Sequence, residues 1–487
     1  MTAFFGPVLA VFARIVIAFS VMFLMPLAWA WQLDAPALRN IWLRSLGLTL
    51  VVGLILMLLT KNHRRELAVR DGFLLVNLVW LVLPALSAVP LLLAIDGLSW
   101  TDAYFEAMSA LTATGATVLS GLDALPVSVN VWRCFLQLVG GLGIMLLVVA
   151  VLPLLGLGGV QLYKAETPGP MKDARLTPRI AETARGLWGV YGVLSVACLL
   201  AYHTAGMSWA DAFMHMCTTM GLGGFSSHDA SFGHWNSPLM EAVAVLFMGL
   251  AGISFARYFI VWRARSLRSL VRDQEVRAYV AVLLAASVVL TGVLVVHGTQ
   301  ATLLDDVRAA VFHVVSLATT TGYASQDYTL WPVFAPVLLL SLGCYVSCAG
   351  STGGGIKMVR MILLFKRTHR ELVRAVHPNV VNPITLGRNV IPVSVMASVV
   401  AFMLIYIAAI VGLTMLMLLS GLDMVTAFSA VVATLNNIGP GLGLVGPSAN
   451  FGVLTDFQTW VCTVAMWMGR LELLAVMVLF VPQFWRR

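Results

Sequence analysis

Four short turns in the sequence have a backbone that could hold a dehydrated cation, and one of them is Thr320-Thr321-Gly322-Tyr323. Glycine adopts backbone angles that other residues avoid, so such a turn can direct successive carbonyl oxygens toward one point. Carbonyl oxygens arranged in this way replace the hydration shell of an ion in channel filters. A threonine followed by glycine is also an ordinary way to end a helix. The prediction therefore depends on whether the chain repeats the pattern.

The pattern recurs three more times, each time after a short segment that carries a phenylalanine. The phenylalanine stands ten residues before the turn glycine in three repeats and eleven before it in the fourth, at Phe105, Phe213, Phe312 and Phe428. Segments of about 10 residues cannot cross a hydrocarbon layer that needs about 20, so we expect them to enter the membrane and return. Chance breaks in unrelated helix hairpins are disfavoured by the matched spacing. The predicted ion-binding backbone residues are Ala113, Thr114 and Gly115; Gly221, Leu222 and Gly223; Thr320, Thr321 and Gly322; and Asn437, Ile438 and Gly439.

The composition places these turns inside a membrane. Of 487 residues, 60% are hydrophobic and 11% are charged, with a mean hydropathy of +0.92, whereas soluble domains carry roughly 25% charged residues. The formal net charge is +8, but the basic residues cluster at alternate ends of successive apolar segments, which is the positive-inside pattern. We therefore expect contact with membrane lipid and no nucleic-acid partner.

The expected fold is an all-α polytopic membrane protein. Four pseudo-repeated units, each a helix, a short pore helix and a second helix, surround a central pore, and two extra transmembrane helices precede them. The second helix of a unit is expected to be continuous over Val131–Leu155, Pro238–Trp262 and Phe457–Phe480, and interrupted only within Phe334–Phe365. The predicted segments are residues 1–71 for the N-terminal helix pair and residues 72–183, 184–275, 276–388 and 389–487 for pore units 1 to 4.

A glycine run interrupts the second helix of unit 3. Because each glycine costs about 1 kcal/mol relative to alanine inside a helix, we expect a loop at Gly350, Ser351, Thr352, Gly353, Gly354 and Gly355. The run superficially matches a phosphate-binding loop, but Ile356 stands where the lysine should be and no strand precedes it. Nucleotide binding is therefore not expected there. Lys357 is predicted to point into a cytoplasmic vestibule, or to serve only as a positive-inside anchor.

Arg470 is predicted to lie inside an apolar helix, where a charge is costly and usually faces a pore or a partner. The alternatives are an ion pair with Glu472 or Glu241, or a side chain that reaches the membrane interface.

Aspartates gather on the side of the chain to which the turns open. An acidic mouth would concentrate cations, although aspartates at helix starts also serve as N-caps, and both interpretations can hold together. These residues are Asp96, Asp102, Asp123, Asp211, Asp229, Asp305, Asp306, Asp327, Asp423 and Asp456.

Other polar residues carry weaker signals. His228 and His313 favour packing at the mouth or on a pore helix over proton transfer. Cys344 and Cys348 share a helix face, but no nearby ligands complete a zinc site. Ser226, Ser227 and His228 lack a nucleophile elbow, and we do not expect an enzyme.

In combination, these motifs resemble the Trk/Ktr/HKT potassium-transport superfamily. The four turns are similar to its four pore loops. Three further stretches resemble the bacterial Trk branch: Tyr163–Pro170, Thr177–Ile180 and Gly469–Glu472. The resemblance covers nearly the whole chain and implies a Trk-type potassium uptake transmembrane subunit.

The resemblance also implies roles for the residues singled out above. The four turns would bind potassium, with no covalent cofactor. Residues Gly350–Gly355 would form an intramembrane loop that obstructs the pore, and Arg470 would be a positive barrier facing that loop. Departures from the channel sequence Thr-Val-Gly-Tyr-Gly leave the preference for potassium over sodium open.

The family further implies partners and a location. These are a homodimer, a cytoplasmic nucleotide-binding regulatory subunit (TrkA-like), and the bacterial inner (plasma) membrane, with several passes and a cytoplasmic N-terminus. The regulatory subunit is expected to dock on the basic segments Lys164–Arg185 and Lys366–Arg388.

A second function stays open. Secondary transporters also combine repeats with discontinuous helices, and such a protein could carry another cation such as sodium. Their repeats are often inverted, whereas the four units here keep one orientation. Symport with protons or sodium, as opposed to channel-like conduction, is not decided by these residues.

Overall fold

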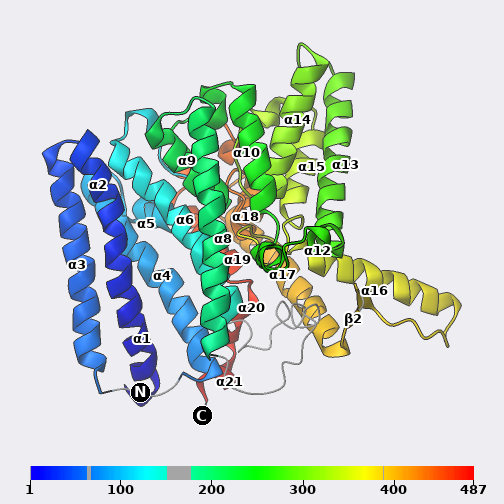
Figure 1. Ribbon diagram of the computed structural model, residues 1–487, viewed down its shortest axis with the longest axis horizontal. Coiled ribbons are helices and arrows are strands. Elements are labelled where there is room, and N and C mark those ends of the chain that lie inside the picture. The colour runs from blue at the N-terminus through cyan, green and yellow to red at the C-terminus, as the bar shows by residue number, and fades with distance from the viewer. Residues whose placement is uncertain (1, 63–66, 151–176, 388, 487) are drawn as a thin grey trace.

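The structure is a computed structural model that describes residues 2–62, 67–150, 177–387 and 389–486. It is built almost entirely of helices, which run roughly side by side in one bundle (Figure 1). Among the described residues, six helices are long and apolar enough to cross a membrane, and up to eight spans are possible if each bent helix pair is one span. The prediction of an all-α polytopic membrane protein is confirmed.

The N-terminal helices pack against the first unit. They are α1 (Thr2–Ser20), the short 3-10 turn η1 (Val21–Phe23), α2 (Leu24–Leu33) and α3 (Pro36–Thr60). Both carboxylate oxygens of Asp34 accept backbone N–H groups of Val127 and Ser128, at 3.2 and 2.9 Å, and so cap the start of α6. Trp42 donates to the Ser128 hydroxyl at 2.9 Å. The helix pair is thus anchored by polar contacts as well as by packing.

The remaining long helices follow in the predicted order. They are α4 (Val69–Ala94) and α6 (Val127–Ala150); α8 (Thr177–Thr204), α10 (Pro238–Ala251) and α11 (Phe255–Ala264); α13 (Gln274–Val296), α15 (Phe334–Gly343) and α16 (Met358–Val376); and α17 (Val393–Leu419) and α19 (Asp456–Arg470). Shorter pieces are α12 (Arg268–Val271), α20 (Leu474–Met477), α21 (Pro482–Trp485) and the 3-10 turns η2 (Leu122–Ala124), η3 (Ser231–His234), η4 (Tyr328–Leu330), η5 (Gly443–Val445), η6 (Phe451–Val453) and η7 (Val478–Phe480).

Four short helices lie between these long ones: α5 (Trp100–Leu111), α9 (Trp209–Gly221), α14 (Leu303–Ala318) and α18 (Met424–Leu435). Each starts at a side-chain cap, which satisfies backbone N–H groups that would otherwise lack a partner. The caps are Ser99, Ser208, Thr302 and Asp423. With 12 to 16 residues, each is shorter than a membrane span needs. The predicted short helices are present, and the N-cap interpretation holds for Asp423.

The second helices differ from the prediction in two units. The break in unit 3 is present, because α15 and α16 are separated by residues 344–357. Continuous helices were also expected over Pro238–Trp262 and Phe457–Phe480, and both expectations are wrong. The chain bends by 84° between α10 and α11 and by 106° between α19 and the segment Leu474–Phe480.

Local contacts explain both bends. After α19, Glu472 and Leu473 adopt positive φ values of 56° and 47°, which cannot continue a right-handed helix. After α10, the N–H of Phe255 donates to the Gly350 carbonyl of the unit 3 loop at 3.1 Å. Backbone groups freed by a break are tolerated at membrane depth only where protein satisfies them. The breaks in units 2 and 3 thus support each other.

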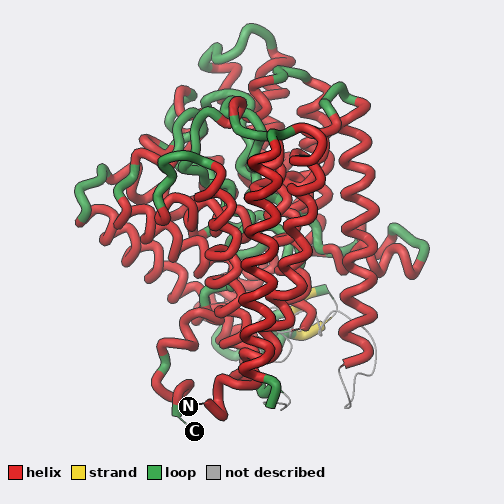
Figure 2. Tube along the Cα trace, turned by 90° about the vertical axis from the view of Figure 1, so that its left-hand side faces the viewer, coloured by secondary structure: helices red, strands yellow, loops and turns green. Residues whose placement is uncertain are grey.

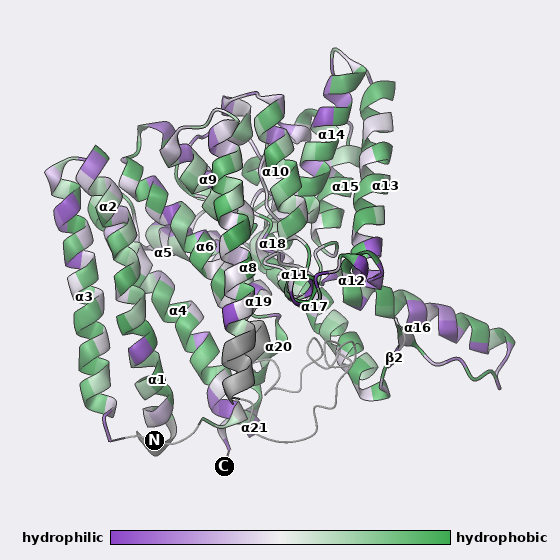
Figure 3. Cartoon of the chain, in the orientation of Figure 1, coloured by the Kyte–Doolittle hydropathy of each residue, from purple (hydrophilic) through white to green (hydrophobic). Residues whose placement is uncertain are grey.

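Most outer helix surfaces are apolar, as the predominance of green in Figure 3 shows. Large apolar side chains are exposed there, among them Leu58 of α3, Val193 of α8, Val288 of α13 and Leu404 of α17. Lipid would cover such side chains in a multi-pass membrane protein. The exception is α16, which extends away from the bundle and carries many hydrophilic residues (Figures 1 and 3). A short antiparallel pair, β1 (Thr385–Leu386) and β2 (Asn389–Val390), follows it. Loops and turns concentrate at the opposite end of the bundle from both termini (Figure 2).

Candidate functional site

The turns that follow the four short helices share one backbone conformation. In each, the first residue has a positive φ that non-glycine residues rarely adopt, and the third is a glycine with a larger positive φ. The N–H of the second residue donates to the carbonyl five residues earlier, over 2.8 or 2.9 Å. The three successive positions are Ala113, Thr114 and Gly115; Leu222, Gly223 and Gly224; Thr320, Thr321 and Gly322; and Asn437, Ile438 and Gly439.

The four turns close into a ring. A Cβ added to the third-position glycine of any turn would fall against the second-position carbonyl oxygen of the next turn. The distances would be 2.1 Å for Gly115 and Gly223, 1.9 Å for Gly224 and Thr321, 2.0 Å for Gly322 and Ile438, and 2.8 Å for Gly439 and Thr114. No side chain fits at that approach, so glycine is required both for its φ and for its lack of a Cβ. The ring runs through units 1, 2, 3 and 4 in order and returns to unit 1.

One predicted turn is displaced by one residue. The structure places Leu222, Gly223 and Gly224 at the equivalent positions of unit 2, not Gly221, Leu222 and Gly223, and Gly221 is the last residue of α9. A ten-residue spacing from Phe213 predicted Gly223 as the third position, but unit 2 has the eleven-residue spacing of unit 4, from Phe213 to Gly224. Three glycines in four residues left the sequence without a local signal for the register.

A cavity opens on the outer side of the ring. All four third-position glycines line it, together with residues of the loops above them, including Thr117, Phe225, His228 and Asn450. The residue after the ring glycine contacts a neighbouring unit in two turns, at Phe225 and Tyr323. Tyr323, for example, is fully buried, and its hydroxyl donates to the His215 carbonyl of α9 at 3.3 Å and lies 3.0 Å from the Thr219 hydroxyl. Such contacts hold adjacent turns at a set separation.

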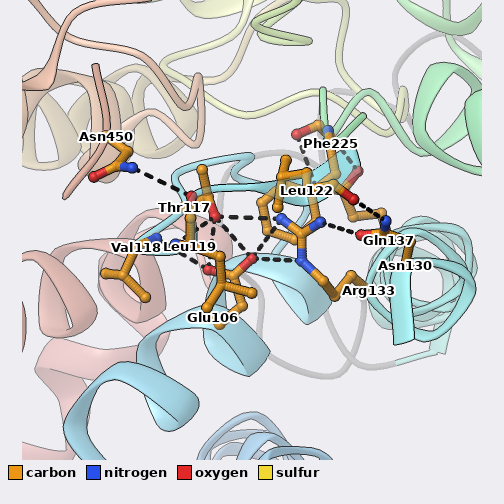
Figure 4. Close-up of polar contacts among 11 residues, drawn as sticks. Glu106, Thr117, Val118, Leu119, Leu122, Asn130, Arg133, Gln137, Phe225 and Asn450 are labelled. Atoms are coloured by element: carbon orange, nitrogen blue, oxygen red, sulfur yellow. Dashed lines mark hydrogen bonds and ion pairs between the residues drawn. The ribbon is translucent and has the colours of Figure 1, made fainter. Parts of the chain in front are cut away.

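A buried ion pair that was not predicted from the sequence supports the first turn. Glu106 of α5 and Arg133 of α6 are almost fully buried, with 2.7 Å between the Arg133 Nη2 and a Glu106 oxygen. Figure 4 shows the Thr117 hydroxyl beside both; it donates to the carboxylate at 3.0 Å. The backbone N–H of Val118 donates to the Glu106 carboxylate at 3.1 Å. The Arg133 guanidinium also lies over the Phe225 ring, 4.4 Å from its centroid. Glu106 and Arg133 each lie in a largely apolar segment, and a charge in such a segment was the sequence signal that could have identified the pair.

The ring is not chemically four-fold symmetric. The Gln137 side chain donates to the Gly223 carbonyl at 2.9 Å and accepts the Phe225 N–H at 3.2 Å. Between units 4 and 1, the Asn437 amide donates to the Thr114 hydroxyl at 2.9 Å. Each unit thus fixes its turn with different side chains.

The unit 3 loop lies directly beneath the ring. Its residues 352–354 contact the ends of three short helices: the Thr352 hydroxyl donates to the Met220 carbonyl at 3.0 Å, and the Gly354 N–H donates to the Thr320 hydroxyl at 2.8 Å. A Cβ at Gly354 would lie 2.1 Å from the Asn436 carbonyl oxygen. Gly353 is packed as tightly, with the Thr319 carbonyl oxygen 2.8 Å from an added Cβ. The loop therefore spans the axis of the ring rather than its rim.

Arg470 forms a hydrogen bond to this loop. It is 3% exposed and ends α19, so it does not lie within a continuous helix as predicted. Its guanidinium donates to the Thr352 carbonyl at 2.8 Å and the Gly140 carbonyl at 3.0 Å. The alternative ion pairs are wrong, because Glu472 pairs with Arg360 and Glu241 with Arg308. Within the described ranges, Arg470 has no carboxylate partner.

Lys357 does not project into an open vestibule. It is 7% exposed, adopts a φ of 77°, and donates its ammonium hydrogen to the Gly353 carbonyl. The prediction that Lys357 points into a cytoplasmic vestibule is therefore wrong, and the side chain instead bonds to the loop itself.

Carboxylates and histidines of the outer loops form a hydrogen-bonded group. His228 contacts Asp123, and its other ring nitrogen lies 3.5 Å from an Asp211 oxygen. Burial alone would lower the pKa of His228, but the neighbouring carboxylates of Asp211 and Asp123 outweigh burial and raise that pKa. The hydrogen bond from His228 in turn lowers the pKa of Asp123. His228 thus lies at the mouth, whereas His313 is fully buried, with its Nδ1 2.8 Å from the Ala309 carbonyl of α14.

Some predictions concern residues outside the described ranges. The stretch Tyr163–Pro170 and residues 164–176 of the basic segment Lys164–Arg185 are among them. All six cysteines are free, and Cys344 and Cys348 form no metal group among the described residues.

Comparison with known proteins identifies relatives over almost the whole chain. A family model described as "TrkH: Cation transport protein" matches residues 40–487. The Trk system potassium uptake protein TrkH of Halomonas elongata is 43% identical over 91% of this chain and 92% of its own length. The protein of the same name from Escherichia coli K12 is 44% identical over 90% of each chain. The crystal structure of the potassium transporter TrkH from Vibrio parahaemolyticus superposes with a TM-score of 0.92, at 37% identity, and covers 99% of this chain and 100% of that one.

Proposed function

Since the chain belongs to the TrkH family of cation transport proteins, we propose that it takes up potassium ions through the ring of four turns. Family membership agrees with the resemblance seen in the sequence and with the expectation that the protein is not an enzyme. Relatives that are 43% and 44% identical are named as potassium uptake proteins. The ion proposed here follows from those names.

The closed ring is the observation that carries the proposal. Four glycines, each close to a carbonyl oxygen of the next turn, line the outer cavity. A potassium ion would enter the cavity, lose water and bind to backbone oxygens of the ring, as in other carbonyl filters. The short helices end at the ring, and the partial negative charge of their C-terminal ends favours a cation there.

The loop beneath the ring is proposed as the gate. Residues Gly350–Gly355 and Arg470 occupy the inner side of the ring through contacts with three short helices and α6. The Arg470 charge would oppose a cation that leaves the ring on this side. Conduction would require the loop, with Lys357 folded into it, to move away from the axis.

The proposed setting is the bacterial inner membrane, with a cytoplasmic N-terminus. Four pore units with the residue ranges given above, and a homodimer, are part of the same proposal. A cytoplasmic nucleotide-binding regulatory subunit (TrkA-like) would dock on the basic segment that begins at Lys366. Supporting this, α16 projects from the bundle and exposes Phe365, Leu372 and Val376 beside its basic residues (Figure 1).

Flux measurements in liposomes test the function directly. With imposed potassium, sodium and pH gradients, we expect tracer potassium uptake that follows the potassium gradient and exceeds tracer sodium uptake. Uptake that follows only sodium, with no potassium flux, would favour a secondary transporter for another cation.

A further inference from the structure

Three potential metal ligands meet at the outer mouth, from loops of two different units. Asp123 lies in η2 of unit 1, and His228 and His234 lie in the loop that follows the unit 2 turn. One ligand atom from each lies within 4.8 Å of the other two. His228 and His234 stack with parallel rings, 3.6 Å between centroids, and both present Nδ1 toward the same Asp123 oxygen.

Hydrogen bonds between the two loops hold this group together. The Asp229 N–H donates to Asp123 at 3.2 Å, and the Leu122 N–H donates to Asp229 at 3.1 Å. Each loop thus supplies a carboxylate to the backbone of the other. These bonds join the two loops and so hold the three side chains near one another.

A further carboxylate lies close to the central ligand. The His228 Nε2 faces an Asp211 oxygen at 3.5 Å, while its Nδ1 faces Asp123. Asp211 is itself held by the hydroxyls of Ser227 and Ser208, at 2.8 and 2.7 Å. Metal-bound histidines commonly direct their second ring nitrogen at a carboxylate, which fixes the tautomer and the ring. In His228 the Nε2 faces the Asp211 carboxylate without a hydrogen bond, at 3.5 Å, and Nδ1 is the atom directed at the proposed site.

The donor set selects a class of ion. Two imidazoles and one carboxylate suit Zn²⁺ and similar divalent transition metals, whereas Mg²⁺ and Ca²⁺ prefer oxygen ligands. Ligands of one tetrahedral zinc ion lie about 3.3 Å apart, given Zn–N lengths of ~2.0 Å. A metal ion lies in the plane of each imidazole that binds it, so one of the two parallel histidine rings must rotate for both to bind the same ion. The side chains of Asp123 and His234 are 49% and 43% exposed. Solvent can therefore reach the group, and a water can complete the shell.

We propose that Asp123, His228 and His234 form a site for zinc or a similar transition-metal ion, and that the bound ion hinders cation entry. His228 also lines the cavity above the ring, beside Gly224. A divalent ion here would neutralise the acidic rim and repel monovalent cations at the entrance. The effect on uptake rests on the proposed function, whereas metal binding does not.

Binding of zinc to the full-length purified protein tests the site. We expect one zinc ion per chain by isothermal titration, and at least tenfold weaker binding in both His234→Ala and Asp123→Asn. His297→Ala removes an exposed histidine elsewhere on the loop side and should leave zinc affinity unchanged. Cobalt provides a second readout, because visible absorption of tetrahedral cobalt should appear in the parent and be lost in His234→Ala. Absence of stoichiometric binding, or equal affinity in His234→Ala and the parent, would overturn the site.

Tracer potassium uptake with external zinc tests the consequence. For each protein, uptake with zinc is compared with uptake without zinc. We expect zinc to reduce uptake several-fold in the parent and in His297→Ala but not in His234→Ala. Zinc that binds without reducing uptake would overturn the proposed effect on entry. If no variant takes up potassium without zinc, the proposed function fails, while the binding result still decides the metal site.

Discussion

Gly322 approaches Ile438 so closely that a Cβ on the glycine would lie 2.0 Å from the isoleucine carbonyl oxygen. These two residues belong to different units and are more than a hundred positions apart in the sequence. The contact leaves no room for a side chain, so the separation between the turns of units 3 and 4 depends on glycine at this position. Equivalent contacts between the other neighbouring turns join all four turns into one continuous ring.

Gly322→Ser should therefore widen or distort the ring. The added atoms must displace the unit 4 turn, and the φ of 85° strains any residue with a Cβ. We expect the preference for potassium over sodium to fall by about tenfold, which corresponds to about 1.4 kcal/mol. Competing tracer uptake of the two ions in liposomes measures this. Unchanged selectivity in a folded variant would contradict the proposed role of the ring.

The register of the second turn can be tested with alanine. Gly224→Ala would place a Cβ 1.9 Å from the Thr321 carbonyl oxygen at a φ of 74°. At Gly223 the nearest atoms are those of the Gln137 side chain, which can shift with loss of its hydrogen bonds to the turn, whereas the Thr321 carbonyl belongs to the backbone. We expect potassium uptake to fall more in Gly224→Ala than in Gly223→Ala. Gly97→Ala controls for strain alone, since its φ is 79° and nothing lies within 4 Å. A larger loss at Gly223 than at Gly224 would favour the register expected from the sequence.

Arg470→Ala should increase flux that is independent of any regulatory subunit. A charge within ~8 Å of a cation, at an effective dielectric of ~20, opposes it by roughly 2 kcal/mol, or about 30-fold. Removal of the guanidinium also frees the Thr352 and Gly140 carbonyls, which loosens the loop. Passive tracer flux through liposomes containing only this chain measures the change.

Arg470→Lys separates charge from hydrogen bonding in that experiment. Lysine keeps the charge but cannot span both carbonyls with a planar fork, so we expect flux between those of the parent and Arg470→Ala. A loss of folded protein in both variants, with no rise in flux, would assign Arg470 a purely structural role.

Glu106→Gln should destabilise the protein. The substitution leaves the Arg133 guanidinium buried beside a neutral amide, and breaking a buried ion pair costs about 3–5 kcal/mol. Thermal unfolding of the purified protein should therefore shift to lower temperature, and the first turn should lose its support through Thr117 and Val118. The matched control is Glu371→Gln, which removes an exposed pair with Arg370 and should leave the transition unchanged. Equal unfolding temperatures in the two variants would show that the buried ion pair contributes nothing to stability.

Features that depend on neighbours in the sequence could be predicted without the structure. The short helices were recognisable because a cap residue, an amphipathic segment and a glycine turn follow one another directly along the chain. The break at Gly350–Gly355 was recognisable because consecutive glycines disfavour a helix wherever they occur. Hydrophobic composition alone established the membrane class.

Only the tertiary structure decided features that depend on contacts between units. Leu222 and Gly224 take the ring positions in unit 2 because Gly224 must meet the Thr321 carbonyl, a contact that three nearby glycines could not reveal. α19 ends at Arg470, whose guanidinium donates to the Thr352 and Gly140 carbonyls. The residues that follow are apolar enough that the sequence predicted a continuing helix. Asp123 joins His228 and His234 only because two loops far apart in the chain fold together. Helix, turn and membrane preferences are local properties, whereas register, partners and ligand groups are set by packing across the bundle.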